Sequence, residues 1–151
     1  MGRIIGSIQL DAGSVKNEHI LSTERIDADL QQHLYRCFTN FDLAITGTPV
    51  AREEILFVAE VAGTIRQFAG LAVVDGSSAS VTLDLKKNGT TCLSSVVTIT
   101  NATGDGTVVD GTLSVTTVAV GDRLSVALAV SSSTGMQGVC AWFTVEEGSA
   151  P

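Results

Sequence analysis

One stretch of the chain alternates strictly between apolar and polar side chains and then ends in a turn dipeptide. The apolar positions are Val81, Leu83 and Leu85, and the polar positions between them are Thr82, Asp84 and Lys86. A period of two predicts a β-strand with one buried and one solvated face. Asn88-Gly89 follows at once, and this dipeptide accepts the positive φ angles of a tight hairpin turn. This part of the chain is therefore expected to be antiparallel β-structure.

Further apolar runs follow the same pattern between residues 55 and 145, separated by glycine-rich, polar turns. No helical pattern long enough for a crossover lies between them, which favours antiparallel sheets. The sequence thus predicts a mostly β protein, an antiparallel β-sandwich or jelly roll, and leaves the choice between the two open. The expected strands cover residues 55–61 and 65–74 (a hairpin through Gly63-Thr64), 81–86, 93–99, 113–115, 124–130 and 139–145, with turns or loops at 75–78, 101–111 and 131–135.

The first 36 residues differ in style from the remainder. They carry about −1 of the net charge of −7, and residues 37–151 carry about −6. Ile26, Leu30, Leu34 and Cys37 recur at helical spacing, so the sequence predicts a short helix over residues 27–36. A helix of this length is unstable alone and needs a surface to pack on. We therefore expect an N-terminal extended arm at residues 1–36 that contains one short helix, followed by a β-sandwich domain at residues 37–151.

Charge and hydropathy exclude two classes of partner. Nine basic residues are scattered among sixteen acidic ones, whereas a phosphate-binding surface needs clustered Lys and Arg, so no nucleic acid is expected. No apolar run reaches 18 residues, so no membrane span is expected. The start of the chain lacks the apolar stretch of a signal peptide.

Three widely spaced cysteines, Cys37, Cys92 and Cys140, predict free buried thiols made in a reducing cytoplasm.

No motif for catalysis stands out. His19 and His33 have no second histidine or cysteine at ligand spacing, and no Gly-x-Ser-x-Gly elbow is present. Serine or cysteine nucleophiles therefore lack a recognisable base, and the chain is expected not to be an enzyme and to need no cofactor. The Asn88 and Asn101 sequons should be silent without secretion.

Two acidic pairs and one tryptophan leave binding hypotheses open. Asp27 with Asp29 could bind a divalent ion, and Asp105 with Asp110 in a glycine-rich loop could bind calcium. The alternative, which we favour, is helix-start charge for the first pair and turn chemistry for the second, with no metal. Trp142 is expected on the face opposite Phe143, either packed under a neighbour or exposed as a platform for a sugar ring.

Three segments together resemble a known family. Residues 81–90 form a strand that ends in Lys87-Asn88-Gly89, residues 110–113 read Asp-Gly-Thr-Leu, and residues 120–126 read Val-Gly-Asp-Arg-Leu-Ser-Val. These patterns are similar to the β domains of tailed-bacteriophage head proteins, namely capsid decoration (cement) proteins and head-fibre proteins. The resemblance covers roughly residues 50–147 and carries no functional residue that transfers one by one.

The resemblance implies a structural role and a place. Such proteins often form homotrimers on the outer face of the capsid and bind the major capsid protein through an extended terminal arm. The expected location is the capsid surface of a virion, after synthesis in the host cytoplasm. The expected buried contacts of the arm are Ile4, Ile8, Leu10, Ile26, Leu30 and Leu34. The alternative is a host-recognition or carbohydrate-binding β-sandwich module of a phage fibre.

Overall fold

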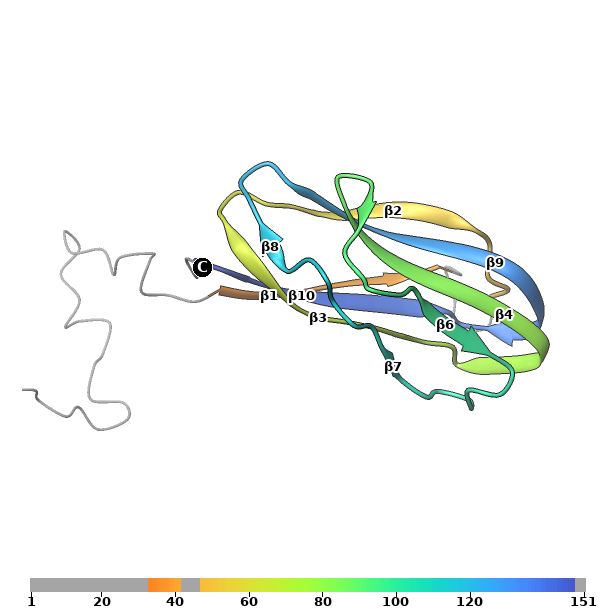
Figure 1. Ribbon diagram of the computed structural model, residues 1–151. Coiled ribbons are helices and arrows are strands. Elements are labelled where there is room, and N and C mark those ends of the chain that lie inside the picture. Colours follow the sequence, from red (N-terminus) through yellow and green to blue (C-terminus); the bar gives the residue numbers. More distant parts are fainter. Residues whose placement is uncertain (1–32, 42–46, 149–151) are drawn as a thin grey trace, which may run out of the picture.

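The computed structural model describes residues 33–41 and 47–148, and these residues fold into two packed antiparallel sheets (Figure 1). The predicted β-sandwich is confirmed. The described strands are β1 (His33–Asn40), β2 (Arg52–Val58), β3 (Gly63–Leu71), β4 (Val74–Lys87), β5 (Thr90–Thr91), β6 (Val97–Thr100), β7 (Val109–Asp110), β8 (Thr117–Val118), β9 (Arg123–Gln137) and β10 (Cys140–Glu147).

The chain crosses between the two layers at most of its connections. Sheet A has the order β1-β10-β3-β7, with β8 also paired to β3. Sheet B has the order β2-β9-β4-β5, with β6 also paired to β4. Strands β1 and β2 are thus the end strands of their sheets. Within the described residues, no helix is long and apolar enough to cross a membrane.

The alternating segment behaves as its sequence predicts. Val81, Leu83 and Leu85 on β4 are completely buried between the sheets. Asn88 and Gly89 take φ angles of 52° and 85°, the left-handed values that the turn from β4 to β5 requires. Each fully buried side chain of this size contributes about 1.5–3 kcal/mol relative to its exposed state. Facing side chains from sheet A, including Phe68 and Phe143, complete the core.

The predicted short helix is wrong over residues 33–36, which form the first half of β1. These residues pair in register with β10, so that His33 lies opposite Glu147 and Arg36 opposite Thr144. Inward-facing Cys37 packs against the core, and Tyr35 contacts Phe57 of sheet B at a ring distance of 6.1 Å. A strand satisfies the backbone through the ladder with β10, whereas a three-turn helix would lack that support. Residues 27–32 of the predicted helix lie outside the described residues.

Strand β1 also crosses the predicted boundary between arm and domain at residues 36 and 37. Its eight residues pair with β10 along their whole length, down to Asn40 opposite Cys140. Residues 33–36 therefore belong to the sandwich. Of the predicted arm, residues 1–32 lie outside the described residues.

The predicted hairpin between residues 55–61 and 65–74 is also wrong. Strand β2 pairs with β9 in sheet B, and β3 pairs with β10 in sheet A, so the connection passes from one layer to the other. The predicted breaks at residues 75–78 and 131–135 lie inside long strands instead. There β4 and β9 face each other through a β-bulge, where Gly76 and Gly135 take φ angles of 79° and 73°.

Within the described structure, Cys37, Cys92 and Cys140 form no disulfide. Cys92 and Cys140 are buried, and Cys37 is partly buried. Burial raises the pKa of the Cys92 and Cys37 thiols, because the charged thiolate loses its hydration. At neutral pH these groups therefore act as small apolar residues.

Candidate functional site

The outer face of sheet A carries large apolar side chains next to the start of β1. Because Tyr35 and Cys37 point inward, their neighbours Leu34 and Phe38 point outward, and these are 66% and 58% exposed. Phe38 lies opposite Trp142 of β10, and Trp142 is half-buried on the same face. The tryptophan is on the face opposite Phe143, as predicted. A solvent-facing row of this kind is a candidate contact surface.

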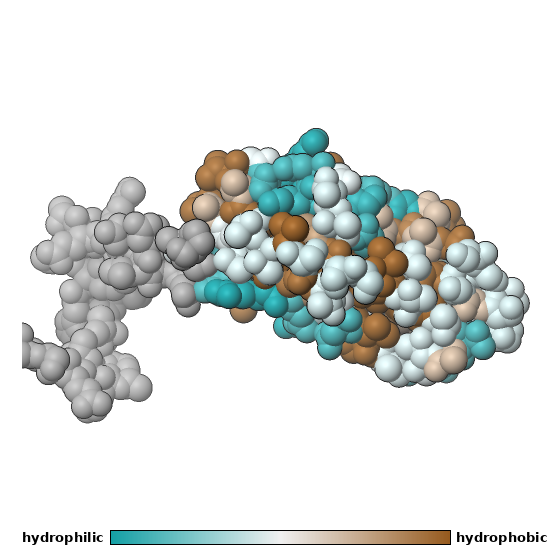
Figure 2. All heavy atoms as spheres, viewed as in Figure 1, coloured by the Kyte–Doolittle hydropathy of each residue, from teal (hydrophilic) through white to brown (hydrophobic). Residues whose placement is uncertain are grey.

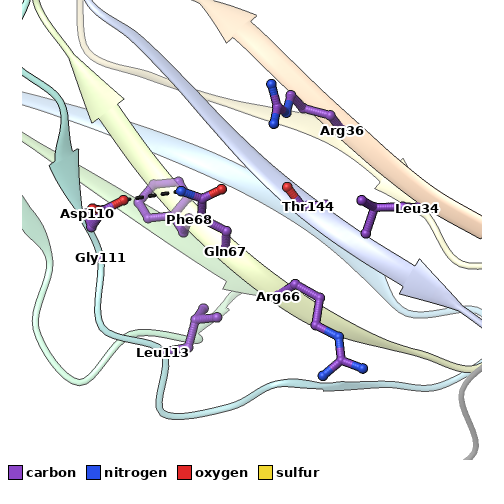
Figure 3. Close-up of a pocket in the computed structure, with 9 residues that line it drawn as sticks. All are labelled: Leu34, Arg36, Arg66, Gln67, Phe68, Asp110, Gly111, Leu113 and Thr144. Carbon is purple, nitrogen blue, oxygen red and sulfur yellow. Dashed lines mark hydrogen bonds between the residues drawn. The ribbon is translucent and has the colours of Figure 1, made fainter.

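A groove of about 750 Å³ adjoins this row on the outer face of sheet A (Figure 3). Strand β1 supplies one wall, β3 and the segment after β7 supply the other, and Thr144 of β10 lies between them. In Figure 3 the side chains of Leu34 and Arg36 lie across from those of Arg66 and Gln67. The lining residues are Leu34, Arg36, Arg66, Gln67, Phe68, Asp110, Gly111, Leu113 and Thr144.

The β3 wall of the groove depends on a β-bulge. Gln67 pairs with Thr144 and Ile65 with Val145, so Arg66 is the extra residue between them. The bulge turns the Arg66 side chain along the sheet, where its Nε atom donates to Glu146. Gln67 Nε2 donates to Asp110 Oδ1 at 3.3 Å and joins β3 to β7 (Figure 3). The groove thus presents guanidinium groups beside apolar side chains.

Gly111 allows the far wall to approach β3. Its backbone N–H donates to the carbonyl oxygen of Phe68 at 2.8 Å. A Cβ atom at position 111 would lie 2.8 Å from Phe68 Cδ1 and 3.1 Å from Val97 Cγ2. Only glycine therefore fits without displacing core side chains, which explains the Asp110-Gly111 sequence at this point.

Polar contacts join the end strands β1 and β2 along one edge of the sandwich. Arg52 Nε lies 2.8 Å from Glu54 Oε1, and Arg52 Nη2 donates to the Asn40 carbonyl oxygen at 3.0 Å. Thr39 Oγ1 also donates to Glu54. These contacts pair the charges of Arg52 and Glu54, although Arg52 Nε is buried without a hydrogen bond of good geometry. Inward-pointing charged groups at the end strands discourage pairing with another strand.

On the outer face of sheet B, β2 exposes Ile55 and Val58, at 58% and 54%. Tyr35 of β1, on the inward face of sheet A, is 42% exposed at the edge of the sandwich. Partial desolvation raises the pKa of Tyr35, and the nearby carboxylates Glu147 and Glu60 raise it further. The side of the sandwich that carries β6, β7 and β8 lies away from the end strands β1 and β2. On that side, apolar residues form separate patches between polar ones (Figure 2).

Only some of the residues singled out in the sequence lie within the described structure. Of the predicted arm contacts, Leu34 lies at the rim of the groove, whereas Ile4, Ile8, Leu10, Ile26 and Leu30 lie outside the described residues. His19, Asp27 and Asp29 lie outside them as well. His33 opens β1, with its ring 6.2 Å from that of Tyr35. The groove itself was not predicted, because it depends on contacts between strands far apart in the sequence.

The hypothesised pair of Asp105 and Asp110 is separated in the structure. Asp110 bonds to Gln67, whereas Asp105 Oδ1 accepts a hydrogen bond from the backbone N–H of Asp75 at 2.8 Å. Across residues 33–41 and 47–148, three or more His, Cys, Asp or Glu side chains nowhere gather as a metal site. The groove on the outer face of sheet A is lined instead by apolar side chains and by the guanidinium groups of Arg36 and Arg66.

Comparison with known proteins adds no assignment. No protein-family model, no curated protein and no solved structure matches the chain significantly.

Proposed function

We propose that this protein is a structural virion protein that decorates and stabilises an icosahedral phage capsid. It binds the outer face of the major capsid protein shell. The observation that carries the proposal is the exposed apolar row of Leu34 and Phe38 beside the groove, at the point where residues 1–32 join the sandwich. An arm and an adjoining apolar surface together provide a wide contact with a protein shell.

Strand order supports the proposal. The strand order β1-β10-β3-β7 over β2-β9-β4-β5 supports the jelly-roll form of the predicted β-sandwich. Jelly rolls occur in viral capsid and lectin domains, although a fold alone does not assign a function. The similarity of residues 81–90, 110–113 and 120–126 to phage head proteins points in the same direction.

The mechanism is mass action. A protein that binds the assembled shell and not its dissociated subunits raises the shell's stability, and this gain grows with the logarithm of its free concentration above Kd. Many identical copies on one shell, and several arms on one oligomer, convert a weak single contact into durable attachment. The negative charge of residues 37–151 keeps the outward surface solvated and repels nucleic acid.

The proposed assembly is a homotrimer. Light scattering on the full chain should then give three times the chain mass of 15.6 kDa. A strict monomer at the concentration used for shell binding would contradict the trimer.

Shell binding is tested by co-sedimentation with capsids assembled from the major capsid protein of the same genome. The full chain should pellet with expanded shells, and a Leu34→Asp/Phe38→Asp variant should lose most of this binding. Thr98→Asp is the matched control, because Thr98 is exposed on the outer face of sheet B. Equal binding by all three folded proteins would refute a role for the outer face of sheet A.

A second candidate, a carbohydrate-binding module of a phage fibre, is favoured by one observation. Trp142 is half-buried beside Phe38 on an outer face, and a ring in this position can stack on a sugar. A glycan array probed with the full chain and with Trp142→Ala separates the two functions. Binding that requires Trp142 supports the fibre module, and its absence favours the capsid role.

A further inference from the structure

One end of the sandwich holds a buried carboxylate that lacks a full set of partners. Asp75 lies near the start of β4, at the end remote from the start of β1 and the end of β10 (Figure 1). Asp75 is only 3% exposed. Asp75 Oδ2 accepts a hydrogen bond from the backbone N–H of Gly104, whereas Oδ1 is buried without any hydrogen-bond partner. A buried carboxylate oxygen in this state is costly.

The carboxylate of Asp105 lies against the backbone of Asp75. Asp105 Oδ1 accepts from the N–H of Asp75 at 2.8 Å, so the two acidic residues are adjacent. Among the described residues, no lysine or arginine forms an ion pair with either one; the ion pairs found there involve other carboxylates. Two neighbouring negative groups without a counter-charge attract a cation, and most strongly where one of them is desolvated.

The loop that carries Asp105 is held by one hydrogen bond to the segment between β3 and β4 and by another within the loop. Gly106 N–H donates to the Ala72 carbonyl oxygen at 2.8 Å, and Thr107 N–H donates to the Gly104 carbonyl oxygen at 3.0 Å. Gly104 and Gly106 take φ angles of 99° and 67°, so this loop turns sharply next to Asp75. Backbone carbonyl oxygens of loops are common ligands of hard cations, so this loop can add ligands to the two carboxylates.

We propose that Asp75 and Asp105 bind a calcium ion at this end of the sandwich. The two carboxylates supply the charge, and carbonyl oxygens of the loop at residues 101–108 and water complete the coordination. Calcium fits better than magnesium, because it accepts six to eight oxygens in a flexible geometry, whereas magnesium demands a near-ideal octahedron. The unpartnered Asp75 Oδ1 is the atom that the ion satisfies. This inference does not depend on the proposed capsid role.

The test uses the full chain, freed of divalent ions with a chelator that is then removed. Isothermal titration with calcium chloride should show one site per chain, and calcium should raise the Tm by several degrees over magnesium at equal ionic strength. Asp105→Asn should weaken calcium binding by about tenfold or more, since a ligand charge is lost. Asp110→Asn is the control and should bind as the unmodified chain does, because Asp110 bonds to Gln67 elsewhere.

Asp75→Asn is the sharper variant, although burial of the position can prevent folding. Where it folds, it should lose calcium binding; where it does not fold, Asp105→Asn decides, because its side chain is exposed. The proposal is overturned if the unmodified chain shows neither heat of binding nor a calcium-specific rise in Tm at millimolar calcium. It is equally overturned if Asp105→Asn binds calcium as tightly as the control.

Discussion

Phe38 on β1 lies directly opposite Trp142 on β10, and both side chains project from the outer face of sheet A. Aromatic cross-strand pairs of this kind contribute about 0.2–1 kcal/mol to a sheet. Since β1 is the end strand of its sheet, the pair stands where another polypeptide can reach it.

Replacing Phe38 should change the surroundings of Trp142 more than the stability of the fold. We expect Phe38→Ala to lower the free energy of unfolding by about 1 kcal/mol or less, because the side chain is already largely exposed. The chain contains a single tryptophan, so its emission reports on this site alone. The emission maximum should move to longer wavelength. Ile55→Ala, on the outer face of sheet B, should leave the emission unchanged.

Gly111→Ala should destabilise the wall of the groove. The added methyl group would meet Phe68 at 2.8 Å, and overpacking of this kind costs about 1–3 kcal/mol. Urea denaturation measures the loss. In a Phe68→Leu background the same substitution should cost less, because the clashing ring is gone, and additive costs in this double-mutant cycle would contradict the account.

Acid should weaken the turn before β9. The pKa of Asp122 is lowered by hydrogen bonds from the Ala119 backbone N–H and from the Asn88 side chain, with a further contribution from Lys87. Because the folded pKa lies below the unfolded one, this stabilisation is complete above the unfolded pKa of about 4 and is lost as pH falls through the folded pKa. Unfolding of the unmodified chain and of Asp122→Asn, measured from pH 7 to pH 2.5, should therefore converge at low pH. A gap that stays constant with pH would show that ionisation of Asp122 does not matter.

The thiols should react in an order set by burial. Cys92 is completely buried and its pKa is raised, so alkylation at neutral pH should require unfolding. Cys37 is partly buried and should react sooner, although more slowly than a free thiol, because its pKa is raised too. Mass spectrometry of peptides after timed alkylation identifies each site. Rapid modification of Cys92 in the folded protein would contradict the packing of the core.

Local patterns in the sequence predict the parts of the fold that local forces decide. The alternation at residues 81–86 and the Asn88-Gly89 turn are both confirmed, because pleating and turn sterics act over a few residues. The spacing of Leu34 and Cys37 fits a helix, yet Tyr35, Cys37 and Thr39 fit the inner face of a strand equally well. The ladder with β10, whose residues lie 100 or more positions further along the chain, decides between the two.

The candidate sites depend on contacts that no local pattern reveals. Residues 101–111 predict an acidic loop, but the partner of Asp105 is Asp75 on β4, and the partner of Asp110 is Gln67 on β3. The hairpin expected around Gly63 failed for the same reason, since closeness in sequence does not tell which sheet a strand joins. The positions of these residues depend on which strands pair in the folded protein, and not on local secondary-structure propensity.

If the outer face of sheet A and the chain that leads into β1 contact a capsid shell, both become less accessible to solvent on binding. Hydrogen–deuterium exchange on the full chain, free and bound to expanded shells, measures this change. Exchange should slow on binding in peptides that cover residues 1–32 and β1, with little change in β5 and β6 of sheet B. Protection confined to sheet B, or the same exchange in the free and bound states, would contradict this contact.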